Sequence, residues 1–154
     1  MAHRIGLISD THGLLRPQAL AALQGCDFIV HGGDIGNPAI LAQLEGIAPV
    51  TAVRGNNDSG PAYRDVPETA HLQVGTIGLY VLHDLKQLDL DPQEAGIRVV
   101  VSGHSHKPAV QERGGVLYVN PGSAGPRRFT LPISVAELLV EAEAVSARII
   151  ELKL

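Results

Sequence analysis

The chain has 154 residues, which is enough for one domain with its own core, and we expect residues 1–154 to form a single domain. Hydrophobic residues make up 45% and charged residues 18%, a mixture that excludes a disordered chain. The net charge of -4, the lack of a basic run and the 3% aromatic content make nucleic acid an unlikely partner. No stretch approaches the roughly 20 apolar residues of a membrane span, so no membrane partner is expected. Cys26 is the only cysteine, which fits a reducing compartment, and without a signal-like start we expect a cytoplasmic location.

Short apolar runs alternate with helix-like segments in the first half of the chain. Strands are predicted over Ile5–Ser9, Phe28–His31 and Val50–Val53, and helices over Pro17–Gln24 and Pro38–Leu44. Prolines near the helix starts and glycines after the helix ends support these boundaries. The alternation is typical of βαβ units around a buried sheet.

The second half is richer in strands than in helices. The predicted strands are His71–Val74, Ile77–His83, Arg98–Ser102, Ala109–Arg113 and Val116–Asn120, the last two forming a hairpin. Residues 120–132 are predicted to be a loop inside the domain. The C-terminal segment, residues 133–154, fits either a hairpin or a helix, and its β-branched residues favour strands. The periodicity alone therefore indicates a mixed α/β domain.

Polar side chains able to bind metals follow five of the predicted strands. In chain order the clusters are Ser9–Gly13, His31–Asp34, Arg54–Asp58, His83–Asp84 and Ser102–His106. In an open α/β sheet, sites form at the carboxyl ends of the strands, so five such clusters can converge. Each cluster alone is a weak signal, because short polar segments of this kind are commonly plain turns. Their order and spacing together are much more specific.

This ordered set resembles the calcineurin-like metallophosphoesterases, whose pattern is DxH, GD, GN, a single His and GHxH. Here the pattern appears as Asp10-Thr11-His12, Gly33-Asp34, Gly55-Asn56-Asn57-Asp58, His83 and Gly103-His104-Ser105-His106. The resemblance runs from residue 4 to about residue 128 and is greatest to the small single-domain phosphodiesterase branch, which also includes a retromer scaffold subunit. The implied fold is α/β, a four-layer α/β/β/α sandwich of two mixed sheets flanked by helices.

The resemblance also implies a site for two divalent metal ions. The implied ligands are Asp10, His12 and His106 for the first ion, Asn56, His83 and His104 for the second, and Asp34 as a bridge between both. Manganese is expected first, with iron, nickel or zinc as alternatives, because carboxylate, amide and imidazole together suit such metals. A pair of ions lowers the pKa of bound water, so that a metal-bridging hydroxide would attack phosphorus. Asp34, Asn56 and His104 are accordingly predicted to be catalytic.

Two further residues are predicted to contact the substrate. Asn57 stands where many members of the family have a His that helps to protonate the leaving group. An amide can donate a hydrogen bond to phosphate but cannot act as a general acid near pH 7, so we expect activated aryl esters to react best. Arg127 is predicted to contact phosphate through its guanidinium group. Arg54 and Arg128 offer the same chemistry, with surface solvation preferred for Arg128.

Two residues beside the ligands are expected to support them. His31 lies three positions before Asp34 and could orient it through a hydrogen bond, the alternative being an ordinary buried histidine. Asp58 could bind near Asn57 or cap a turn, and the turn is preferred.

The sequence thus predicts a metal-dependent phosphodiesterase that acts on a small-molecule phosphate ester. The alternatives are a phosphomonoesterase or nuclease of the same fold, and a non-catalytic scaffold for protein interaction. All seven candidate positions hold competent ligands, which favours the enzyme. An exposed strand edge near the C-terminus could permit a homodimer.

Overall fold

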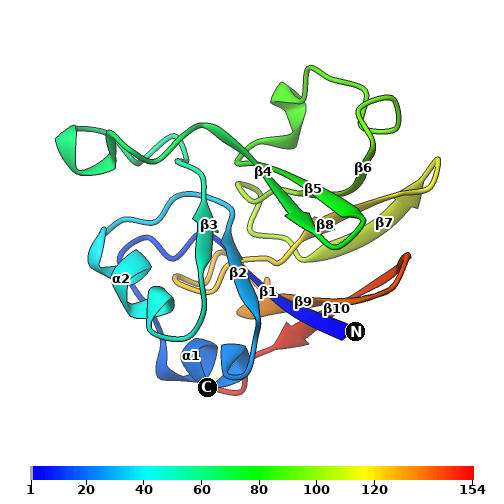
Figure 1. Ribbon diagram of the computed structural model, residues 1–154. Coiled ribbons are helices and arrows are strands. Elements are labelled where there is room, and N and C mark those ends of the chain that lie inside the picture. The colour runs from blue at the N-terminus through cyan, green and yellow to red at the C-terminus, as the bar shows by residue number, and fades with distance from the viewer. Residues whose placement is uncertain (1) are drawn as a thin grey trace.

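The computed structural model describes residues 2–154, which form two five-stranded sheets packed face to face (Figure 1). The first sheet has the order β10-β9-β1-β2-β3 and consists of β1 (Ala2–Ile8), β2 (Phe28–His31), β3 (Val50–Ala52), β9 (Ser134–Glu141) and β10 (Ala144–Glu151). The second has the order β4-β5-β6-β8-β7 and consists of β4 (Thr69–Val74), β5 (Ile77–Leu82), β6 (Ile97–Val101), β7 (Ala109–Arg113) and β8 (Val116–Asn120). Each sheet has two parallel and two antiparallel pairings between neighbouring strands, so both are mixed, as predicted.

The layers outside the two sheets are unequal. Helices α1 (Pro17–Leu23) and α2 (Ala39–Glu45) cover the outer face of the first sheet (Figure 1). Over the second sheet, the part of the chain that the structure describes has only a 3-10 helix, Leu85–Gln87, with its flanking loop. The side chain of Asp84 accepts a hydrogen bond from Lys86 N and that of Asp91 from Gln93 N, and such local bonds favour turns over a longer helix. The predicted fold is confirmed, with its fourth layer reduced to this short segment.

Strand periodicity divides the apolar residues between the layers. Ile5 and Leu7 of β1 are fully buried in the core between the sheets, where they share a cluster with Leu79 and Val81 of β5. Ile8 points the other way and packs in the cluster under the helices. Burying one such side chain contributes about 1.5–3 kcal/mol, so this alternation fixes which face of β1 is turned inward.

The C-terminal segment is a β-hairpin rather than a helix. β9 pairs with β1 along its length, from Ala2↔Glu141 to Leu7↔Ala136, and β10 pairs with β9. This pairing also explains why β1 begins at Ala2, three residues before the predicted start, because the β9 neighbour satisfies the backbone of those residues. The strand prediction for this segment is confirmed.

The parallel strands bring their carboxyl ends to one edge of the molecule. β1, β2 and β3 run parallel in the first sheet, and β5, β6 and β8 run parallel in the second. The five polar clusters of the sequence follow β1, β2, β3, β5 and β6. Within residues 2–154, no helix has the length and apolar character needed to cross a membrane.

Candidate metal centre

The loops after β1 and β2 run side by side and carry the first candidate ligands. Asp10 N donates to the carbonyl of Gly33, His12 N to that of Asp34, and Gly13 N to that of Ile35. These three hydrogen bonds continue the pairing of β1 with β2 beyond the strands. They hold Asp10 and His12 against Asp34 without the help of a bound ion.

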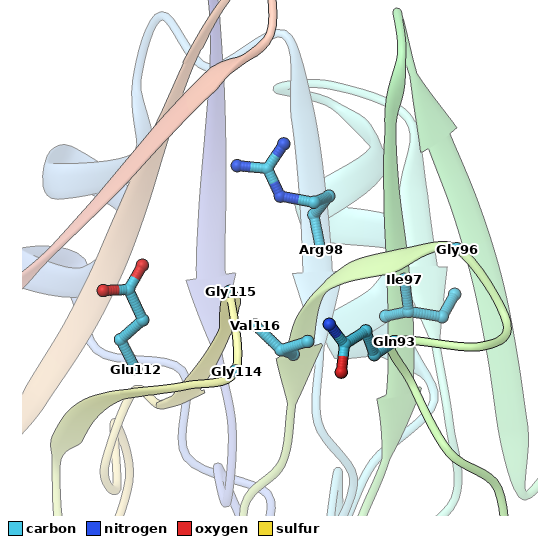
Figure 2. Close-up of a pocket in the computed structure, with 8 residues that line it drawn as sticks. All are labelled: Gln93, Gly96, Ile97, Arg98, Glu112, Gly114, Gly115 and Val116. Atoms are coloured by element: carbon cyan, nitrogen blue, oxygen red, sulfur yellow. The ribbon is translucent and has the colours of Figure 1, made fainter.

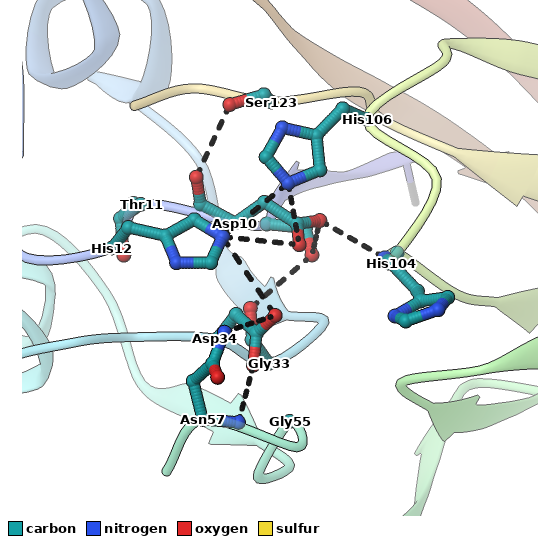
Figure 3. A network of polar contacts seen from close by, with 12 residues as sticks. Asp10, Thr11, His12, Gly33, Asp34, Gly55, Asn57, His104, His106 and Ser123 are labelled. Carbon is teal, nitrogen blue, oxygen red and sulfur yellow. Dashed lines mark hydrogen bonds and ion pairs between the residues drawn. The ribbon is translucent and has the colours of Figure 1, made fainter. Parts of the chain in front are cut away.

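Six charged or imidazole side chains gather into two groups, drawn in part in Figure 3. The enclosed group consists of Asp10, His12 and His106, and the pocket group consists of Asp34, His83 and His104. Within each group, one ligand atom per residue lies within 4.8 Å of the others. The seventh candidate, Asn56, lines the same pocket as His83 and His104.

Asp34 lies between the two groups. Its Oδ2 is 3.2 Å from Nε2 of His83 in the pocket group and 3.7 Å from Nε2 of His12 in the enclosed group. In the enclosed group, Asp10 Oδ1 is 3.4 Å from His106 Nε2. This is the placement that a bridging carboxylate needs.

Several buried polar atoms of these side chains lack a protein partner. Among the described residues, Asp10 Oδ1, His83 Nε2 and His106 Nδ1 are buried without a hydrogen bond. An unsatisfied buried polar group costs roughly 1–3 kcal/mol, so native proteins rarely keep three in one place without a ligand. Carboxylate oxygens and neutral imidazole nitrogens are ligands for borderline divalent cations. The residues present therefore fit a pair of such ions.

The backbone at the candidate ligands is strained. Seven non-glycine residues of the described chain have positive φ, and five of them are Asp10, His12, Asp34, His104 and His106. A left-handed conformation costs a non-glycine residue roughly 1–2 kcal/mol. Strain of this kind persists only where the surroundings enforce it and clusters at functional sites. Five of the seven strained residues are therefore candidate ligands that face one another.

Asp10 presents one oxygen to the protein and one to the site. Its Oδ2 accepts hydrogen bonds from Ser9 Oγ at 2.8 Å and from His104 N at 3.1 Å, which leaves Oδ1 free. Burial raises the pKa of the Asp10 carboxyl group. Ser9 was not predicted from the sequence, because a serine inside a strand pattern carries no signal of its own. Gly103 is required beside it, since a Cβ there would lie 2.1 Å from Ser9 Oγ.

Asp34 and His83 stabilise each other's charged forms. Burial opposes ionisation of Asp34, but the neighbouring His83 ring and the hydrogen bond from Asn57 N lower its pKa to about 2. Burial would likewise lower the pKa of His83, yet Asp34 and the carbonyl of Gly32 raise it overall. His83 Nδ1 lies 2.7 Å from that carbonyl, so Nδ1 carries a proton and Nε2 faces the site. Asn57 thus reaches Asp34 by its main chain at 3.0 Å and by its side chain at 3.4 Å.

His31 contacts the neighbours of the ligands rather than Asp34. Gly33 N donates to His31 Nδ1 at 3.0 Å, so the proton is on Nε2, which lies 3.1 Å from Thr11 Oγ1. Thr11 in turn donates to the carbonyl of Ile35. His31 is fully buried, and burial lowers its pKa to about 4. The neutral ring therefore links the loops that carry Asp10 and Asp34.

Asp58 ties the loop after β2 to the loop after β3. Its buried carboxylate accepts hydrogen bonds from the main-chain nitrogens of Ile35, Gly36 and Gly55. Asp58 N also donates to Gly55 O, so the residue closes the turn that the sequence favoured. The cross-loop bonds to Ile35 and Gly36 have no sequence signature, because their partners lie more than twenty positions away.

The arginines after β8 lie in a loop packed against the enclosed group. Ser123 Oγ is 3.2 Å from the carbonyl of Asp10, which anchors this loop (Figure 3). Arg127 donates to the carbonyl of Leu131 at 3.2 Å. Arg128 is close enough for its charge to act, together with burial, in lowering the pKa of His106 to about 4. Arg128 is nevertheless exposed, as the sequence favoured.

A pocket of about 720 Å³ opens beside the pocket group. Its lining includes Arg54, Asn56, Tyr80, His83, Asp84, Asp89 and His104. A smaller pocket of about 380 Å³, shown in Figure 2, is lined by Ile97 and Val116 with the loops beside them. Those two residues begin β6 and β8, so the smaller pocket lies at the opposite end of the strands from the candidate ligands. Of these two pockets, the larger one lies at the candidate ligands.

Comparison with known proteins identifies the class of protein that this fold and site define. Residues 3–143 match the calcineurin-like phosphoesterase superfamily domain, and the chain belongs to that family. A probable metallophosphoesterase of Methanothermobacter thermautotrophicus is 35% identical over 95% of this chain and 91% of its own length. A phosphodiesterase of Methanocaldococcus jannaschii is 25% identical over 77% of this chain and 82% of its own. Vacuolar Protein Sorting 29 from Cryptosporidium parvum has the same fold, with a TM-score of 0.84 at 21% identity over 99% of this chain and 92% of its own.

Proposed function

We propose that this protein is a phosphodiesterase that uses two divalent metal ions, with manganese ahead of iron, nickel or zinc. The observation that carries the proposal is the pair of side-chain groups that share Asp34 and hold unpartnered buried atoms. Two bound divalent ions would supply a water of lowered pKa and positive charge for the phosphate oxygens. The carboxylates of Asp10 and Asp34 would offset only two of four positive charges, so an anionic substrate is favoured there.

The proposed ligands are the seven residues predicted from the sequence. Asp10, His12 and His106 hold one ion, Asn56, His83 and His104 hold the other, and Asp34 contacts both. Asp34 is oriented by Asn57, and His83 is oriented by the carbonyl of Gly32. Asn57 is in addition proposed as a hydrogen-bond donor to the substrate, with Arg127 or Arg128 supplying a positive charge at the other side.

A diester is proposed rather than a monoester because a large pocket beside the site can take a second ester arm. One side opens into the 720 Å³ pocket, and the other meets the exposed loop that contains Arg128. The M. jannaschii phosphodiesterase supports the same choice. A phosphomonoesterase or nuclease remains the alternative within the fold. The similarity to Vacuolar Protein Sorting 29 keeps a role in protein interaction as the alternative outside catalysis.

The test is hydrolysis of bis-4-nitrophenyl phosphate and 4-nitrophenyl phosphate by metal-stripped protein with Mn, Fe, Ni, Zn or Mg restored in turn. We expect metal-dependent cleavage that is faster for the diester. Asp34→Ala should abolish it, whereas Asp65→Ala, which removes an exposed carboxylate outside the pocket lining, should not. A folded protein with no activity under any metal would contradict the proposal and favour the interaction role.

Two further proposals concern the cellular location and the oligomeric state of the protein. A cytoplasmic location is supported by the lone, buried Cys26, and fractionation of the source cells tests it. A homodimer is supported by the eight-residue edge strand β10, and sedimentation velocity tests it. A monomer at all concentrations would contradict the dimer proposal.

A further inference from the structure

The pocket beside the pocket group has an uneven distribution of charge. Its carboxylates are those of Asp58, Glu68, Asp84 and Asp89, against the single guanidinium of Arg54. Arg54 and Glu68 pair with each other at 3.5 Å. The carboxylate of Asp58 accepts hydrogen bonds from three main-chain nitrogens. Asp84 and Asp89 are therefore the carboxylates whose charge the other side chains of the lining leave uncompensated.

One wall of the same pocket is formed by candidate metal ligands. His83 and His104 line it, and His83 is 94% buried with Nε2 lacking a hydrogen-bond partner among the described residues. A phosphate held at that wall would meet positive charge. The rest of its ester arm would then extend toward Asp84 and Asp89.

An aromatic side chain contributes to the same pocket. Tyr80 lines the pocket and is half-buried by packing on the outer face of the second sheet. The face of an aromatic ring attracts cations, and ammonium groups are bound in proteins by rings and carboxylates together. The pocket lining therefore holds groups that suit a phosphate together with groups that suit a cation.

We propose that this pocket takes the ammonium-bearing arm of a phosphodiester, so that the substrate is a diester of an amino alcohol. Asp84, Asp89 and Tyr80 contact the ammonium group, while the phosphate lies at His83 and His104. This inference rests on the proposed phosphodiesterase function and narrows its substrate class.

The test compares two diesters of equal shape and different charge. In 4-nitrophenyl phosphorylcholine the arm ends in trimethylammonium, and in 4-nitrophenyl 3,3-dimethylbutyl phosphate it ends in a neutral tert-butyl group. In both, a water oxygen bonds to phosphorus, the bond from phosphorus to the aryl oxygen breaks, and 4-nitrophenolate leaves with its electron pair. We expect kcat/KM to be about tenfold higher for the cationic arm and the ratio to fall with added salt.

Charge-removing variants assign the preference to the pocket. Asp84→Asn and Asp89→Asn should each lower the ratio, and asparagine preserves the acceptor with which Asp84 binds Lys86 N. The matched control is Glu94→Gln, which removes one exposed carboxylate from the same loop outside the lining. The ratio should be unchanged in this control. A ratio near one in the wild type, or a ratio that survives both aspartate variants, overturns the proposal.

Failure of the substrate class can be told apart from failure of the function. If bis-4-nitrophenyl phosphate is cleaved while the two arms react equally, the phosphodiesterase proposal stands and the ammonium pocket is wrong. If no diester is cleaved, calorimetry still tests the ammonium pocket. It compares the binding of phosphocholine and of 3,3-dimethylbutyl phosphate to manganese-loaded protein. Binding about tenfold tighter for phosphocholine supports the pocket, and equal binding rejects it.

Discussion

The enclosed group and the pocket group hold similar side chains in different surroundings. In the enclosed group, Asp10 and His106 are almost fully buried and lie against the loop that Ser123 anchors. In the pocket group, Asp34 and His83 are equally buried, but His104 is exposed and lines a large cavity. A position next to solvent can exchange its contents, whereas one enclosed by backbone cannot do so easily. Under the proposed function, the enclosed group would mainly retain its ion and the pocket group would mainly meet the substrate.

The largest effect is expected from deleting one histidine of each group. His106→Ala and His104→Ala should each lower kcat/KM at least about 100-fold, since a bound ion contributes several kcal/mol to phosphoryl transfer. Metal content should separate them, because solvent can replace the exposed His104 but cannot easily replace the buried His106. After dialysis against buffered manganese, plasma mass spectrometry should find nearly two ions per chain in His104→Ala and about one in His106→Ala. Equal contents would mean that burial does not distinguish the groups.

An added side chain should be tolerated far less well at Gly125, which packs over the enclosed group, than at Gly13 on its rim. A Cβ on Gly125 would lie 2.2 Å from the carbonyl oxygen of Thr11, which is backbone and cannot move away cheaply. Gly125→Ala should therefore lower the free energy of unfolding by about 3 kcal/mol. Gly13→Ala is the matched control, because Gly13 has φ +84° but a Cβ there meets nothing closer than 3.9 Å, so only about 1 kcal/mol of backbone strain is expected. Urea unfolding of the metal-free proteins measures both, and similar losses would contradict the packing argument.

Acid should weaken the link that His31 makes between the two loops. The pKa of His31 is about 4 when folded and 6.5 ordinarily, so the unfolded chain takes up the proton first as pH falls. Its contribution is complete above pH 6.5 and is lost toward pH 4, with about 2 kcal/mol gone at pH 5. His31→Gln cannot titrate and can still donate to Thr11, so metal-free His31→Gln should lose less stability between pH 7 and pH 5 than the wild type. Identical pH slopes in urea unfolding would show that His31 is not held neutral.

The smallest effect is expected at Asn57 beside the pocket group. Asn57→His would introduce a side chain able to protonate a leaving group, so poor leaving groups should gain a few-fold in rate while 4-nitrophenolate gains nothing. A series of aryl and alkyl methyl phosphates gives the dependence of log kcat/KM on leaving-group pKa, which should be steep in the wild type and shallower in the variant. A flat dependence in the wild type would remove the role assigned to this position.

Much of the fold and site could be predicted because their signals are local. Short apolar runs specify strands such as Phe28–His31, and polar residues directly after a strand are placed at its carboxyl end whatever else the chain does. Arg127 and Arg128 show the limit, since neighbours of the same type in one loop receive different surroundings that no local pattern records.

The sequence by itself determined the mixed α/β class, the order of the polar clusters and the chemical competence of the seven candidate ligands. Only the tertiary structure decided that His31 binds Thr11, that Asp58 joins two loops, and that the C-terminal segment pairs with β1. It also decided that a pocket with unbalanced carboxylates lies beside His104. The physical reason is range: periodicity and turn chemistry act between near neighbours, whereas burial, hydrogen-bond partners and cavities arise from segments that meet only when the sheets pack.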